Sequence, residues 1–95
     1  MSKPKKRWWN YVRRVLYDFP VMDPEKEADK KEYEAVLSAL QEWPTCSDTY
    51  RLVDAVFFKK THTISGAAMK VLLSERTARR RVNAFIESVG KNLGF

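Results

Sequence analysis

The chain has few of the residue types from which catalytic and metal sites are built. It contains one histidine, His62, and one cysteine, Cys46. It has no Cys/His cluster, no Gly-rich phosphate loop and no acid pair at a recognisable spacing. We therefore interpret His62 as an exposed turn residue and Cys46 as a small space-filler. The sequence predicts a protein that is not an enzyme and that uses no metal or cofactor.

A lone cysteine excludes an internal disulfide, and no apolar run approaches the length of a membrane span. The N-terminus is polar and carries no secretory signal. Together these absences predict a cytoplasmic protein with no membrane partner. With 95 residues and 44% hydrophobic content, the chain fits one small core of marginal stability, to which a homodimer would add.

The chain also lacks the alternating pattern of β-strands, and its apolar residues recur instead at helical spacing. A first helix is expected from Trp8 until just before Pro20, because the residue before a proline disfavours the helical backbone. A second is expected over residues 25–42, with Asp23 as its cap and Pro24 in its first position. Their apolar stripes comprise Trp8, Val12, Val15, Leu16 and Phe19 in the first helix, and Tyr33, Val36, Leu37 and Leu40 in the second.

A helix breaker at residues 43–47 is the best candidate boundary in the chain. Beyond it, Ser47 or Asp48 can cap a third helix from about residue 49 to Lys60. The apolar face of this helix comprises Leu52, Val53, Val56 and Phe57. Gly90 is expected to end or loosen the last helix of the chain.

Charge is distributed unevenly along the sequence. Residues 1–14 carry six bases and no acid, residues 15–48 carry nine acids and three bases, and residues 49–95 carry nine bases and three acids. Two basic ends around an acidic middle indicate that particular surfaces meet a polyanion. The acidic run over residues 25–42 is interpreted first as a solvated face, with a docking surface as the alternative.

The most informative stretch is residues 63–89, which is typical of two helices joined by a short turn. Ser74 is a good N-cap for the second helix, and Glu75 then meets the positive end of the helix dipole. One face of this second helix is apolar and comprises Ala78, Val82, Phe85, Ile86 and Val89. The other faces carry Arg76, Arg79, Arg80, Arg81 and Asn83.

A capped helix with an arginine-rich outer face suits the major groove of DNA. Arginine can pair with guanine edges or grip phosphate, and asparagine can pair with adenine. The alternative is an ordinary surface helix with solvated charges, which four arginines in six residues make the weaker interpretation. We predict an all-α fold in three parts: a basic flexible leader over 1–7, an N-terminal helical pair over 8–44, and a helix-turn-helix unit over 47–95.

The leader and the start of the first helix combine basic and aromatic residues. The basic side chains of Lys3, Lys5, Lys6 and Arg7 are candidates for contact with phosphates or a minor groove. Trp8 and Trp9 are candidates for stacking on unpaired bases. For Trp8 we favour packing in the core, because it begins a helical stripe.

The spacing Ala68-x2-Val71-x-Leu73-Ser74-x2-Thr77-Ala78 resembles the general bacterial helix-turn-helix pattern, which also occurs in the promoter-reading region of sigma factors. More narrowly, RRVLYDFP and TISGAAMKVLLSERTARRRVNAFIESVGKNLG are similar to the ArpU/RinA-type phage regulators. This resemblance implies control of late phage genes by promoter binding. It gives Ser74 and Thr77 cap and phosphate-facing roles, and it makes Arg76, Arg79, Arg80 and Asn83 face the DNA.

One position departs from the family pattern: Leu72 stands where the turn commonly has glycine. A left-handed backbone is costly for leucine. We therefore expect either a turn that follows a different path or a hydrophobic contact made by Leu72.

The leading hypothesis is a cytoplasmic, phage-derived transcription regulator that binds double-stranded DNA sequence-specifically. Lys59 and Lys60 would add phosphate contacts to those of Ser74 and Thr77. One alternative is a small terminase subunit for DNA packaging, although such proteins need an oligomerisation segment and this chain ends soon after Val89. Another is a module that docks on RNA polymerase through residues 25–42. Whether the N-terminal helices pack on the C-terminal unit or mediate dimerisation stays open.

Overall fold

The computed structural model describes residues 8–44 and 47–95. The predictions for the leader and for Cys46 lie outside these residues. The described residues form helices and no strands, which confirms the all-α prediction. In chain order the elements are α1 (Trp8–Asp18), the 3-10 turn η1 (Phe19–Val21), α2 (Glu27–Glu42), α3 (Asp48–Val53), the π-helical turn η2 (Asp54–Phe58), α4 (Ile64–Lys70) and α5 (Glu75–Asn92).

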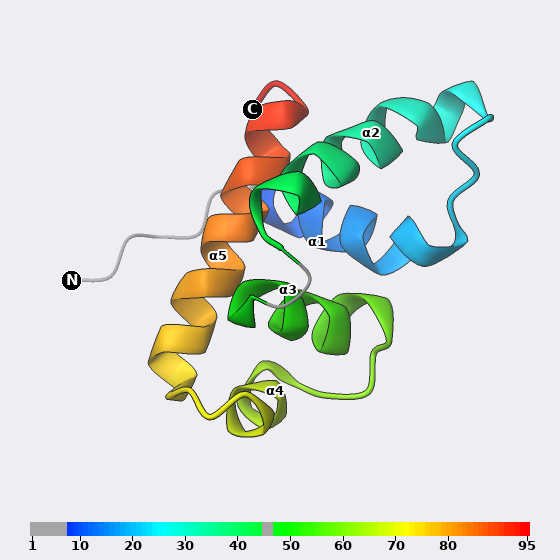
Figure 1. The fold of residues 1–95 in the computed structure, drawn as a ribbon. Coiled ribbons are helices and arrows are strands. Elements are labelled where there is room, and N and C mark those ends of the chain that lie inside the picture. The colour runs from blue at the N-terminus through cyan, green and yellow to red at the C-terminus, as the bar shows by residue number, and fades with distance from the viewer. Residues whose placement is uncertain (1–7, 45–46) are drawn as a thin grey trace.

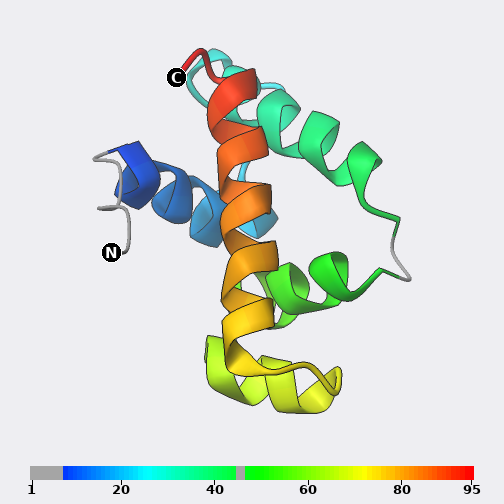
Figure 2. The ribbon, with the colours of Figure 1, turned by 90° about the vertical axis from the view of Figure 1, so that its left-hand side faces the viewer.

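The long helix α5 is the centre of the fold, and α1, α2, α3 and α4 all pack against it. Figure 1 shows α5 passing beside the other four helices, and Figure 2 shows it from the side on which they leave it uncovered. The predicted apolar stripe of α5 is confirmed, because all five members are fully buried: Ala78, Val82, Phe85, Ile86 and Val89. The N-terminal helices α1 and α2 thus pack on the C-terminal unit.

Helix α1 follows its sequence pattern closely. Val12, Val15 and Leu16 are buried, and Trp8 and Phe19 pack against the core from its rim. The helix ends at Asp18 and gives way to the 3-10 turn that contains Pro20, as the restriction before a proline predicts.

Helix α2 differs from its prediction at its start. It begins at Glu27, and Asp23 does not cap it. Instead, the Asp23 carboxylate accepts a hydrogen bond from the Glu25 N–H at 2.9 Å. That short local bond holds Pro24 and Glu25 in a turn before the helix, because aspartate side chains readily bond the backbone two residues on.

The buried face of α2 is also rotated from the predicted one. Leu37 is exposed, and the buried residues are Ala35, Val36 and Ala39. The two alanines allow α2 to approach α5 closely enough for the Asn92 amide to donate to the Ala35 carbonyl at 3.0 Å. The face of α2 that carries these small residues is therefore the buried one, because larger side chains there would hold α2 and α5 further apart.

The third helix begins as predicted, since the Ser47 hydroxyl accepts from the Tyr50 N–H at 3.2 Å. It does not continue regularly to Lys60. From Asp54 it widens into the π-helical turn η2, marked by a Lys59 N–H to Asp54 carbonyl bond of 2.7 Å. Lys60 then adopts a left-handed backbone with φ of 56° and ends the element. The apolar residues remain buried as predicted: Leu52, Val53, Val56 and Phe57.

Gly90 does not end α5, which corrects the prediction. It lies buried inside the helix beneath the Trp8 ring, and a Cβ on Gly90 would fall 2.6 Å from Trp8 Cη2. The helix ends two residues later at Asn92. There Gly94, with φ of 95°, closes a turn in which the Phe95 N–H bonds the Gly90 carbonyl at 2.9 Å. The Phe95 ring stacks on Trp8 with centroids 5.3 Å apart, and this confirms core packing for Trp8.

Candidate nucleic-acid interface

The turn between α4 and α5 closes through two backbone hydrogen bonds. The Leu73 N–H bonds the Ala68 carbonyl at 2.9 Å, and the Leu72 N–H bonds the Met69 carbonyl at 3.2 Å. This is the Schellman pattern that usually has glycine in the left-handed position. Leu72 occupies that position with φ of 60° and is 91% exposed. Both expectations for Leu72 are therefore wrong: the turn keeps its usual path, and the side chain makes no core contact.

The start of α5 is fixed by hydrogen bonds between two side chains and the backbone. The Ser74 hydroxyl accepts from the Thr77 N–H at 3.2 Å, which confirms Ser74 as the cap. The same hydroxyl donates to the Thr77 Oγ1 at 2.9 Å. Because Thr77 accepts this bond, its own hydroxyl proton is left to donate elsewhere. Thr77 therefore keeps a donor that a phosphate oxygen can accept.

Three of the four arginines of α5 lie on its uncovered side. Arg76, Arg79 and Arg80 are exposed, and Asn83 is partly buried. These four residues recur at i, i+3, i+4 and i+7, so they form one stripe along the first turns of α5. Arg81 is also exposed but lies off this stripe, on another side of the helix. The fold thus brings the four predicted base-reading residues together.

Arg79 is already engaged by an acid within this stripe. Its guanidinium donates to the Glu75 carboxylate, with Nη2 at 2.7 Å and Nε at 3.2 Å. A hydrogen bond from Ser65 and the pairing with Arg79 lower the pKa of Glu75 below its ordinary value of 4.5. Nη1 and the second proton of Nη2 are not used by Glu75, so the paired guanidinium can still present two donors to a guanine. The i, i+4 spacing of the two residues is the sequence signal for this pair, and our interpretation of Glu75 overlooked it.

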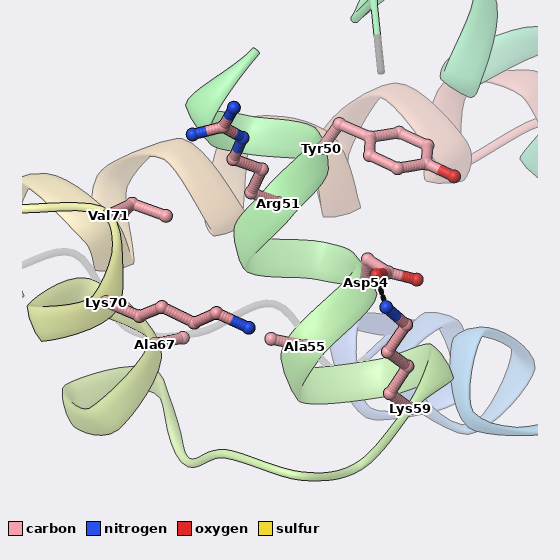
Figure 3. A pocket seen from close by; sticks show the side chains of 8 residues that line it. All are labelled: Tyr50, Arg51, Asp54, Ala55, Lys59, Ala67, Lys70 and Val71. Carbon is pink, nitrogen blue, oxygen red and sulfur yellow. Dashed lines mark ion pairs between the residues drawn. The ribbon is translucent and has the colours of Figure 1, made fainter. Parts of the chain in front are cut away.

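The two predicted phosphate-binding lysines point to different parts of the molecule. Lys59 forms an ion pair with Asp54 at 3.3 Å and lines a groove between α3 and α4. Figure 3 shows Lys70 entering this groove from the opposite wall. Lys60 lies instead beside α1, with its ammonium 5.8 Å from the centre of the Tyr17 ring. The left-handed backbone at Lys60 turns the chain between them, so the two cations do not act as one patch.

No protein-family model, curated protein or solved structure matches the chain. The resemblance to the ArpU/RinA-type regulators therefore stays a prediction that rests on the residues quoted for it. Across residues 8–44 and 47–95, no helix combines the length and apolar character needed to cross a membrane.

Proposed function

We propose that this protein binds double-stranded DNA sequence-specifically, with α5 as the recognition helix in the major groove. The observation that carries the proposal is the stripe of Arg76, Arg79, Arg80 and Asn83 on the uncovered side of a capped helix whose opposite face is fully buried. A rigid helix holds its outer side chains at a fixed spacing, which base readout requires.

Contacts to phosphate would position the helix in the groove. Thr77 supplies a free hydroxyl donor beside the cap at Ser74, and Lys60 supplies an exposed ammonium. Lys59 is a weaker candidate, because Asp54 already offsets its charge. Regulation of transcription is the role that the resemblance to the phage regulators implies, and we include it in the proposal on that ground.

The test begins with selection of bound fragments from randomised duplex DNA. We expect one enriched motif that the chain prefers strongly over random DNA at a stated salt concentration. Arg80→Ala should then weaken binding to the selected site by about 5–150-fold, equivalent to about 1–3 kcal/mol, and relax the preference at one position.

Arg81→Ala is the matched control, because it removes the same charge from the same helix but off the stripe. Arg81→Ala should weaken binding to the selected site and to scrambled DNA to the same small extent. Equal effects of the two variants on specificity would contradict base reading by this stripe. If no motif is enriched and light scattering reveals a large ring, the packaging interpretation replaces the regulator.

A further inference from the structure

A second basic site lies away from the α5 stripe, in a pocket between α1 and the segment that leads into α4. Its polar walls are Arg13 and Tyr17 from α1, together with Lys60 and His62. Phe57 and Ile64 supply apolar surface. Three of these side chains carry or can carry a positive charge, and none of the described residues that line the pocket is a carboxylate. The α3–α4 groove differs in this respect, because it contains Asp54.

Arg13 is the strongest reason to expect a ligand here. Its Nε is buried and has no hydrogen-bond partner among the residues that the structure describes. A buried donor left unsatisfied is costly, and for a charged group the cost is larger. Because Arg13 lines the pocket, an anion bound there would lie beside the guanidinium and offset its charge.

Lys60 and His62 complete the set of donors. The Lys60 ammonium is exposed beside Tyr17, so it can turn toward an anion without disturbing the core. The His62 Nδ1 is 2.8 Å from the Thr61 hydroxyl. When that hydroxyl donates to Nδ1, the neutral ring carries its proton on Nε2, which becomes a third donor.

The position of the pocket indicates the source of the anion. In Figure 2, the start of α1 and the start of α4 lie on the same flank of α5, the helix whose exposed side carries Arg76, Arg79 and Arg80. Duplex DNA held against that side has a phosphate strand on each flank of the groove. We infer that Arg13, Lys60 and His62 form a clamp for a backbone phosphate of the bound DNA. This inference rests on the proposed function.

The test compares two adjacent arginines of α1 in the full chain. Arg13→Gln removes the buried donor, and Arg14→Gln removes the same charge from an exposed residue whose surroundings include Asp18, Asp29 and Glu32. Loss of one phosphate contact should reduce the slope of log affinity against log salt by about 0.9. We expect this reduction for Arg13→Gln on selected and random DNA alike, and an unchanged slope for Arg14→Gln.

A second variant guards against misfolding of Arg13→Gln. Lys60→Asn removes a charge at an exposed position and suits the left-handed backbone there. It should also reduce the slope. In parallel, the Nε–H resonance of Arg13 in the wild-type chain should move and saturate as inorganic phosphate is added, but not with sodium chloride at matched ionic strength.

The outcomes separate this inference from the proposed function. A selected motif together with unchanged slopes for Arg13→Gln and Lys60→Asn would overturn the clamp and leave α5 as the reader. The second outcome is a saturating shift of the Arg13 Nε–H resonance with phosphate in a protein that binds no DNA. It would confirm the anion site, assign it to free phosphate and overturn the proposed DNA function. An Nε–H resonance that responds to neither phosphate nor DNA would overturn the site itself.

Discussion

Substitution of Gly90 by alanine tests the contact that joins the two ends of the chain. In an ordinary helix interior this change stabilises by about 1 kcal/mol. Here the added methyl group would lie 2.6 Å from Trp8 Cη2 and 2.9 Å from Cε3, so the indole ring must move. Overpacking of this kind costs about 1–3 kcal/mol.

Movement of the ring has a further cost. Trp8 lies parallel to Phe95, with 3° between the ring planes, and aromatic pairs contribute about 0.5–1.5 kcal/mol beyond their burial. After the helix-propensity gain is subtracted, we expect Gly90→Ala to reduce the free energy of unfolding by about 1–3 kcal/mol. The melting temperature should fall by about 5–20 °C, measured by circular dichroism.

A double-mutant cycle isolates the cause. In a Trp8→Ala background the methyl group has no ring to meet, so Gly90→Ala should raise the free energy of unfolding by about 1 kcal/mol. The sign of the effect therefore reverses with the residue at position 8. Stabilisation by Gly90→Ala in the wild-type chain, or the same change in both backgrounds, would refute the contact.

Two further variants test the turn and the acid of the candidate interface. Leu72→Gly should stabilise the fold by about 0.5–1 kcal/mol in denaturant unfolding, because it removes the strain of a left-handed leucine whose side chain contacts little. Val71→Gly is the control: Val71 has φ of −98° and is partly buried, so this substitution should destabilise the fold. Glu75→Gln should raise affinity for random DNA several-fold at fixed salt, because it removes an anion from beside the proposed interface; unchanged affinity would place Glu75 and Arg79 away from DNA. Because the pKa of Glu75 is lowered in the folded protein, its ionised form stabilises the fold above pH 4.5. This contribution is lost as pH falls through the lowered pKa. The melting temperature of the wild-type protein should therefore fall more steeply with acidification than that of Glu75→Gln.

The sequence by itself determined much of the local structure of this protein. The stripes of α1 and α5 and the cap Ser74 were predicted correctly, and Ser47 was one of the two caps predicted for the third helix. Each depends on residues within a few positions of one another. Hydrophobic periodicity and side-chain capping act over that range and require no knowledge of distant parts of the chain.

Only the tertiary structure decided which surfaces meet. In the sequence Gly90 is typical of a helix end. In the fold the Trp8 ring, distant in the sequence, leaves no room for a side chain at position 90. Lys59 and Lys60 are neighbours in the chain, yet the π-helical turn and a left-handed residue direct them to separate sites. Arg13 shows no signal of its own in the sequence, whereas in the fold its Nε is buried and its side chain lines a pocket with Lys60 and His62. These features depend on packing between residues far apart in the sequence, where close contact and desolvation override local preference.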